Sequence, residues 1–246
     1  MIDIEDVIRK QIALYRAYDA REDHDQRAGR GKQGKLSLGP YLLISREKGA
    51  GGSAVAQLAG ERLGWQVFDK EIVDTISQKA HVRRELIESL DERIRTTLEG
   101  ALSKLLRSQD IGSHGYLASL NEVLLTLGHQ GDVIIIGRAA EFVLPSQFGL
   151  RVRMVAPLER RIQRIASGER LSLEIARAKV ETADRERASF VRRQFGGSVA
   201  EPLNHDLILN TAELTLDAAA EIVITALQRK LGVTGRRKEA ESVPRP

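Results

Sequence analysis

The sequence predicts an α/β protein in which five short parallel strands form the central layer of a three-layer fold. Two observations support this prediction. Short apolar runs alternate along the chain with longer segments whose apolar residues repeat at helical spacing. The run at 133–136, Val-Ile-Ile-Ile, contains no polar residue, as is typical of a strand buried on both faces of a parallel sheet. Helices that separate five such strands imply right-handed crossovers in one sheet.

The chain before residue 39 is predicted to be an arm outside this fold. Ile4, Ile8, Ile12 and Tyr15 repeat at helical spacing, which predicts an amphipathic helix over residues 3–20. The polar stretch that follows, up to residue 38, has no periodicity and is expected to be a flexible linker. The helix would pack on its own domain or on a second subunit, so a homo-oligomer is one expected assembly.

A glycine-rich turn joins the first predicted strand, at 41–44, to the helix after it. The turn consists of small residues, Gly49, Ala50, Gly51 and Gly52. Strand, glycine turn and helix N-terminus can hold a phosphate, because backbone N–H groups and the helix dipole both favour an anion. In register with G-x-x-x-x-G-K-[ST], the first glycine, second glycine, lysine and hydroxyl positions are taken by Arg46, Gly51, Gly52 and Ser53. The alternative is a plain tight turn.

The middle of the chain is predicted to be mostly helical. A short strand at 65–68 ends before Asp69, and a helix then covers 70–79. The segment 83–107 carries one long apolar stripe and is predicted to be a single helix, followed by another at about 116–129.

Strands and helices alternate again after residue 132. Strands are predicted at 133–136, 150–155 and 206–210, and helices after Pro157, at 172–195 and at 215–231. The helix at 172–195 has few large apolar residues, so we expect it to be mostly exposed and mobile. The basic, proline-containing tail at 232–246 is expected to be disordered.

The charge distribution and the composition limit the classes of ligand that the protein is expected to bind. The net charge of +4 is concentrated in the tail and in residues 151–193, which hold twelve Arg or Lys against six Asp or Glu. Such a local basic segment suits a small, highly charged ligand such as a nucleotide better than nucleic acid, and aromatic residues for base stacking are scarce at 4%. The chain has no apolar run of membrane-spanning length and no signal-like N-terminus, so we expect a cytoplasmic protein without membrane contact.

Six segments, taken in order and spacing, resemble the cytidylate-kinase-like P-loop proteins. They are ISREKGAGGSAVA, VFDKEIVD, VIIIGRAAEFVLP, VRMVAPLERRIQRI, the D-x-x-R run at Asp184–Arg187, and DLILNTAELTLDAAAEI. The similarity covers about residues 40–231 and is greatest to a divergent branch whose loop reads S-R-E-x-G-x-G-G. It implies a kinase domain at 39–231, with an acceptor-binding insertion at about 70–130 and an arginine-rich lid at about 166–196.

The resemblance implies ATP- and Mg²⁺-dependent phosphoryl transfer to a nucleoside monophosphate, with CMP or dCMP as the expected acceptor. The alternative is a nucleotide-binding regulatory protein of the same fold that has lost turnover. Two features favour this alternative. Gly52 replaces the loop lysine, and Ile136 stands where the main cytidylate kinases carry an aspartate.

The resemblance also assigns site residues. ATP contacts are expected from Arg46, Gly49, Ala50, Gly51, Gly52, Ser53, Arg160 and Arg164, and Mg²⁺ ligation from the hydroxyl of Ser53. The acceptor is expected to contact Asp69 and Arg138. Catalytic roles are expected for Lys48, Arg138, Asp184 and Arg187, with Lys48 or Arg46 supplying the charge of the missing lysine.

Each assignment has a structural alternative at this stage. Asp69 is equally suited to cap the helix that begins at residue 70. Single arginines of the 151–193 segment are equally suited to surface ion pairs, for example Arg185 with Glu181.

Overall fold

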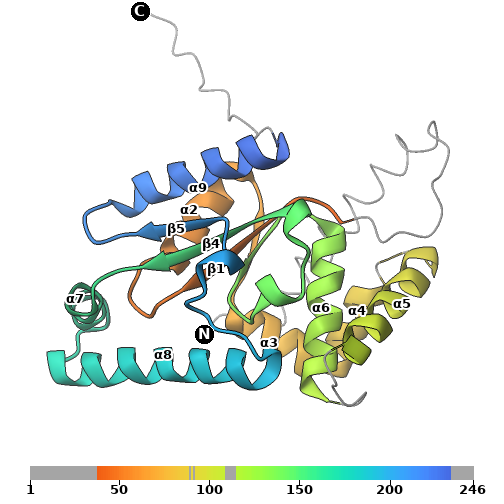
Figure 1. Ribbon diagram of the computed structural model, residues 1–246, viewed down its shortest axis with the longest axis horizontal. Coiled ribbons are helices and arrows are strands. Elements are labelled where there is room, and N and C mark those ends of the chain that lie inside the picture. The colour runs from red at the N-terminus through yellow and green to blue at the C-terminus, as the bar shows by residue number, and fades with distance from the viewer. Residues whose placement is uncertain (1–37, 89, 91, 109–114, 234–246) are drawn as a thin grey trace, which may run out of the picture.

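The computed structural model describes residues 38–88, 90, 92–108 and 115–233, and it confirms the predicted α/β class (Figure 1). All strand pairs are parallel, and the sheet has the order β2-β3-β1-β4-β5. In chain order the strands are β1 (Tyr41–Arg46), β2 (Gln66–Phe68), β3 (Val133–Ile136), β4 (Gly149–Val155) and β5 (Leu207–Asn210). Parallel neighbours need crossover connections, which the helices provide.

Different helices cover the two faces of the sheet, because successive side chains of a strand point to opposite faces. Leu42 and Ile44 of β1 belong to the core formed with α2 and α9, whereas Tyr41 and Leu43 belong to the core formed with α3 and α6. These helices are α2 (Gly52–Leu63), α3 (Lys70–Gln78), α6 (Tyr116–Gln130) and α9 (Leu216–Leu231). The three layers are therefore the ones that the alternation of strands and helices predicts.

The helical insertion differs from its prediction. A single helix over 83–107 is wrong, because the chain forms α4 (Ala80–Glu88) and α5 (Glu92–Ser108) instead. Leu90, between them, is buried, and its N–H donates to the carbonyl of Ile87 at 3.1 Å. Both helices pack against α6 (Figure 1), and the turn at Leu90 redirects the chain so that each can do so.

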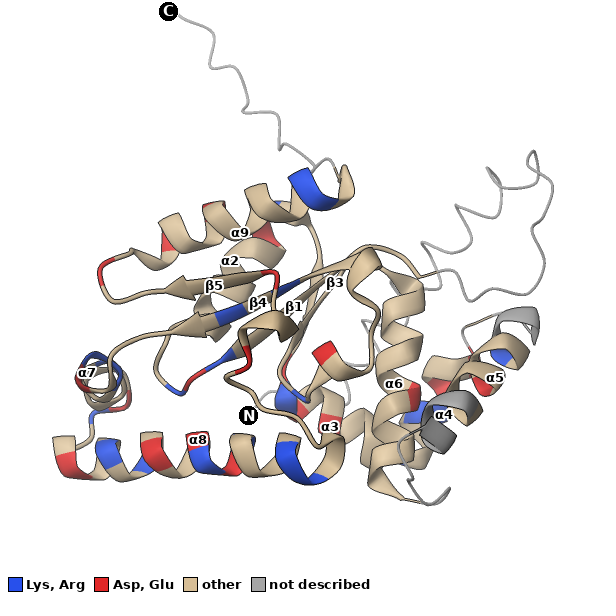
Figure 2. Cartoon of the chain, viewed as in Figure 1, with Lys and Arg blue, Asp and Glu red and all other residues tan. Residues whose placement is uncertain are grey.

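Helix α8 (Leu173–Phe195) and the end of α7 (Leu158–Glu169) fall within the segment, about 166–196, that the resemblance implies to be a lid. They pack on each other through a small apolar cluster of Ile162, Ala176 and Val180. Figure 2 shows Lys and Arg alternating with Asp and Glu along α8. Most of α8 is exposed, as predicted, although the stretch from Ala183 to Phe190 turns some of its side chains toward the sheet.

The carboxyl ends of the central strands position the glycine turn. In the register of the sheet, Ile44 lies beside Ile136 and Arg46 beside Met154. The pairing continues one step beyond the strands, because the N–H of Gly137 donates to Ile44 and that of Glu47 to Met154, each at 3.0 Å. The turn therefore leaves the sheet between β3 and β4, where α/β proteins bind ligands.

The predicted N-terminal helix at 3–20 and the tail beyond residue 233 lie outside the described residues. Within the described part of the chain, no helix is both long and apolar enough to cross a membrane.

Candidate functional site

The glycine turn between β1 and α2 has the backbone of an anion site. Gly49 and Gly51 adopt φ values of 84° and 80°, which favour glycine, and Gly51 is the N-cap of α2. No side chain caps this helix in the described part of the chain, so its first N–H groups remain open to a phosphate. The turn is held by close packing, because a Cβ on Gly49 would lie 2.6 Å from the carbonyl oxygen of Arg161.

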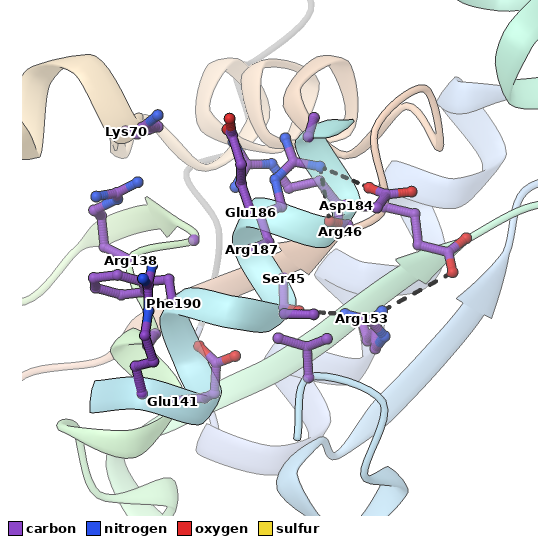
Figure 3. Close-up of a pocket in the computed structure, with 17 residues that line it drawn as sticks. Ser45, Arg46, Lys70, Arg138, Glu141, Arg153, Asp184, Glu186, Arg187 and Phe190 are labelled. Atoms are coloured by element: carbon purple, nitrogen blue, oxygen red, sulfur yellow. Dashed lines mark hydrogen bonds and ion pairs between the residues drawn. The ribbon is translucent and has the colours of Figure 1, made fainter. Parts of the chain in front are cut away.

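A cavity of about 470 Å³ lies at the carboxyl edge of the sheet, where Ser45, Arg46 and Glu47, which lead into this turn, line it (Figure 3). Its cationic lining comes from β1, β4, the turn after β3, the start of α3 and α8, and consists of Arg46, Lys70, Arg138, Arg153, Arg187 and Arg193. Its carboxylates are Glu47, Glu141, Asp184 and Glu186. Six cations against four carboxylates, partly sheltered from water, favour a ligand that carries several negative charges.

Arg138 is fixed from three sides. Its Nη1 lies 3.1 Å from Oδ1 of Asp74 and donates to the hydroxyl of Tyr116 at 2.9 Å. Its guanidinium carbon lies 5.1 Å from the ring centre of Phe190, within cation–π range. Burial, followed by the hydrogen bond to Asp74, raises the pKa of Tyr116 to about 12, so the hydroxyl stays protonated. The guanidinium is therefore oriented before any ligand arrives.

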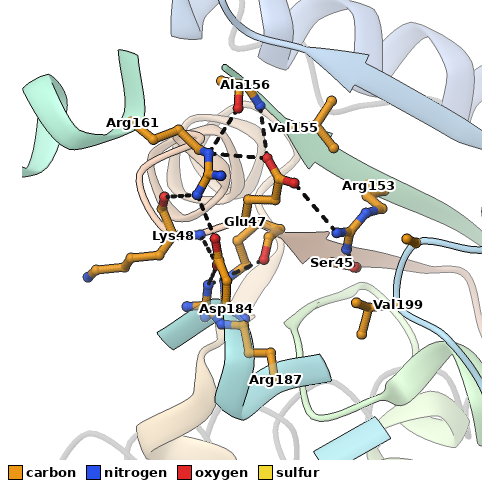
Figure 4. Close-up of polar contacts among 12 residues, drawn as sticks. Ser45, Glu47, Lys48, Arg153, Val155, Ala156, Arg161, Asp184, Arg187 and Val199 are labelled. Atoms are coloured by element: carbon orange, nitrogen blue, oxygen red, sulfur yellow. Dashed lines mark hydrogen bonds and ion pairs between the residues drawn. The ribbon is translucent and has the colours of Figure 1, made fainter. Parts of the chain in front are cut away.

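Asp184 joins α8 to the glycine turn (Figure 4). Its Oδ1 accepts the backbone N–H of Lys48 at 2.8 Å and Nη1 of Arg187 at 3.2 Å. Its Oδ2 accepts Nη1 of Arg161, on α7, at 2.5 Å. One carboxylate thus connects the turn with both α7 and α8.

Glu47 makes a second connection within the same network. Its Oε2 lies 3.2 Å from both Nε of Arg161 and the backbone N of Ala156, and its Oε1 lies 4.0 Å from Arg153. Arg153 in turn donates to the hydroxyl of Ser45 at 2.9 Å, and burial lowers the pKa of its guanidinium. The Ser45-Arg46-Glu47 segment is therefore anchored to the end of β4 and the start of α7.

The sequence matches the cytidylate kinase-like family over residues 42–213, which include the strand–turn–helix, the cavity and the lid segment described above. The chain belongs to this family. A cytidylate kinase from Sulfolobus acidocaldarius is 22% identical over 193 residues, which cover 77% of this chain and 94% of that protein. A cytidylate kinase from Methanopyrus kandleri is 28% identical over 107 residues, 40% of this chain, and the chain spans only 55% of the length of that relative.

Among the solved structures with a similar fold is one that covers most of this chain. It is an uncharacterized protein from Eubacterium ventriosum, with a TM-score of 0.54 and 15% identity. The match covers 76% of this chain and 98% of that one. At this identity the likeness concerns the fold alone.

The structure brings together many of the residues that the family resemblance assigns. Arg46, Arg138, Asp184 and Arg187 all line the cavity. The ion pair expected between Glu181 and Arg185 is also present, at 3.8 Å, on the exposed side of α8. The pairing distinguishes Arg185, turned to solvent, from Arg187, turned to the site.

Three of the cations predicted to act at the site do not line this cavity. The ammonium of Lys48 is 3.5 Å from Glu169, at the far end of α7, and Lys48 is not among the residues that line the cavity. Arg160 pairs with Glu213 at 3.2 Å, and Arg164 donates to Oγ1 of Thr211 at 3.0 Å. Spacing in the sequence cannot predict these orientations, because each depends on a partner from another element.

Asp69 caps α3, since its Oδ1 accepts the N–H of Ile72 at 3.0 Å. Ser53, at the start of α2, has an exposed side chain with no hydrogen bond to the described residues. The described part of the chain contains no group of three or more His, Asp or Glu that could hold a metal ion. The hydroxyl of Ser53 would suit a Mg²⁺ ion that takes its other ligands from phosphate and water.

Sequence reasoning missed several members of the site, among them Asp74, Tyr116 and Glu47. Asp74 and Glu47 lie inside the motifs VFDKEIVD and S-R-E, so a signal for them was present. Tyr116 opens α6 after a stretch without any recognisable motif, and nothing local marks it.

Proposed function

We propose that this protein is a nucleoside monophosphate kinase that transfers the γ-phosphoryl group of ATP to CMP or dCMP. The observation that carries the proposal is the juxtaposition of an uncapped helix N-terminus with a cavity lined by six cations. Membership in the cytidylate kinase-like family supports it, as do the relatives named cytidylate kinase.

The donor nucleotide is proposed to bind at the glycine turn. Gly49 to Ser53 would present N–H groups to the β- and γ-phosphates, and Ser53 would offer its hydroxyl to Mg²⁺. The bound Mg²⁺ would neutralise charge on the phosphate oxygens. Arg160 and Arg164 lie on α7 and are assigned to the donor side by family resemblance only.

The acceptor is proposed to place its phosphate against Arg138. A guanidinium suits a phosphate because two parallel N–H groups can bind two oxygens. An acceptor oxygen would form a bond to the γ-phosphorus while the bond to the β–γ bridging oxygen breaks, and ADP leaves. Asp74, Tyr116 and Phe190 hold Arg138 in place, and Arg187 would approach from α8. Catalysis then rests on positioning and charge neutralisation.

A second candidate is a regulatory protein that binds the nucleotide without turnover. Two observations favour it. The N–H of Lys48, within the turn, is already occupied by Asp184. Ile136 is fully buried and apolar at the position where the main cytidylate kinases carry a carboxylate.

An assay of ADP release with CMP, dCMP, UMP, AMP and several non-nucleotide acceptors separates the two candidates. We expect turnover with CMP or dCMP, lost in Arg187→Ala and retained in the matched control Arg185→Ala on the solvent side of α8. ATP binding without ADP release for any acceptor would reject the kinase and favour the regulatory candidate.

A further inference from the structure

Arg46 occupies an unusual electrostatic position. It ends β1 and lines the cavity, yet its guanidinium makes no hydrogen bond or ion pair with any described residue. By contrast, Arg138, Arg153 and Arg187 each have a hydrogen-bond partner. Burial, together with the charges of Arg187 and Arg138, lowers the pKa of Arg46 to about 10, so the group remains a cation at neutral pH. A sheltered cation without a partner favours binding of an anion.

Two glycines make room for this side chain. A Cβ on Gly52 would lie 2.8 Å from Cβ of Arg46 and 3.1 Å from its Cγ. A Cβ on Gly137 would lie 2.3 Å from Nη1 of Arg46. The arginine therefore passes Gly52 at the start of α2 and ends against Gly137 at the end of β3. It spans the space between the proposed donor and acceptor phosphates.

At positions 46 and 52, the glycine and the cationic residue of a regular phosphate-binding loop stand in the opposite order. A regular phosphate-binding loop has glycine at its first position and lysine after its second glycine. This chain has Arg46 at the first position and Gly52 at the lysine position. The 2.8 Å between a Cβ at position 52 and the Cβ of Arg46 explains why glycine accompanies the arginine, because a side chain at position 52 would displace the one at position 46.

We propose that the guanidinium of Arg46 provides the positive charge that stabilises the transferred phosphoryl group, as the lysine does in a regular loop. We further propose that Gly52 is required because it leaves space for Arg46. The inference rests on the proposed kinase function and names a residue role within it. Lys48 is the competing candidate within the turn. Its ammonium is paired with Glu169 instead.

The test is a set of exchanges between positions 46 and 52. Arg46→Met should lower kcat by about 100-fold or more, whereas Arg46→Lys, which keeps the charge, should lose less. Gly52→Lys alone should also lose activity, because the new side chain collides with Arg46. The double variant Arg46→Gly with Gly52→Lys restores the regular pattern and should exceed both Gly52→Lys and Arg46→Gly by at least about tenfold in kcat. Arg185→Met serves as the control for loss of an exposed arginine.

Two results would overturn the proposal. One is Arg46→Met with the kcat of the unmodified protein, above all if Lys48→Met loses activity, and the other is a double variant no better than the single ones. Thermal unfolding of each variant identifies those that fail to fold. If Arg46→Met fails to fold, the kcat of Arg46→Lys is compared with that of the unmodified protein instead.

If the unmodified protein turns over no acceptor, the kinase function fails by itself. The role of Arg46 is then decided by binding of ATP and inorganic tripolyphosphate, which Arg46→Met should weaken by at least about tenfold. Equal binding by both proteins would reject that role.

Discussion

The carboxylate of Asp184 accepts the backbone N–H of Lys48 at 2.8 Å, across 136 residues of sequence. This bond joins the middle of α8 to the turn that is proposed to hold ATP. Because Asp184 also binds Arg161 and Arg187, its removal leaves two guanidinium groups and one amide without this acceptor.

We therefore expect Asp184→Ala to lower the free energy of unfolding by about 1–3 kcal/mol, less than for a fully buried pair since the carboxylate is partly exposed. Urea unfolding measures the change. Glu186→Ala, two residues further along α8, is the control for loss of a carboxylate that lines the cavity, because Glu186 has no hydrogen bond or ion pair with the described residues. Equal losses in the two variants would contradict the connecting role of Asp184.

Tyr116→Phe removes the hydroxyl that accepts Nη1 of Arg138 and leaves the ring in place. The arginine keeps Asp74 and Phe190 but loses part of its orientation. We expect the KM for the acceptor to rise about three- to tenfold, since one hydrogen bond contributes about 0.5–1.5 kcal/mol, with little change in the KM for ATP. Steady-state kinetics with each substrate varied in turn measures both. A change confined to ATP would place Arg138 on the donor side.

Gly137→Ala and Gly64→Ala form a pair that separates backbone strain from displacement of Arg46. Both glycines have positive φ, 75° and 72°, so alanine should cost each about 1 kcal/mol in the free energy of unfolding. Only at Gly137 does the added Cβ meet the Nη1 of Arg46, because nothing lies within 4 Å of the corresponding atom at Gly64. We expect only Gly137→Ala to lower kcat. Similar kinetics for the two variants would contradict the close approach.

Because of Glu141, we expect the free energy of unfolding to depend on pH. Burial raises the pKa of its carboxyl, and the nearby charges of Arg153, Arg151 and Arg46 only partly oppose this effect. An acid with a raised folded-state pKa binds protons more tightly when folded, so its ionisation lowers stability as the pH rises from its ordinary pKa through its folded one.

We therefore expect Glu141→Gln to gain stability over the unmodified protein at neutral pH. The gain should shrink toward zero as the pH falls below the ordinary range of a glutamate. Urea unfolding at several pH values from about 3.5 to 8 tests this, and that range brackets the ordinary glutamate pKa. A difference that stays constant with pH would show that Glu141 ionises alike in both states.

Periodicity and short motifs predicted the sheet, most helices and the glycine turn, because local chemistry dictates them. The Val-Ile-Ile-Ile run could hardly be exposed, and a chain with Gly49 and Gly51 after a strand is suited to a tight, positive-φ turn. The broken helix at 83–107 escaped prediction because its apolar stripe continues through Leu90, and only packing against α6 divides it.

Side-chain directions could not be predicted in the same way. Lys48 and Arg46 are two residues apart, and either could supply a charge on the basis of sequence alone. Lys48 is drawn to Glu169 on α7, whereas Arg46 enters the space that Gly52 and Gly137 leave. Glu47 and Arg161 likewise meet only because β1 and α7 are brought together by the sheet.

Because α8 is one continuous helix, it links the turn to the surroundings of Arg138. Asp184 holds the turn and Phe190 lies on Arg138, and the six residue steps from one to the other span about 9 Å of one continuous helix. A phosphate that draws the turn away from Asp184 must therefore also shift the ring above the acceptor arginine, unless the helix bends. Donor and acceptor then share a coupling free energy, and by thermodynamic reciprocity each changes the affinity for the other by the same factor.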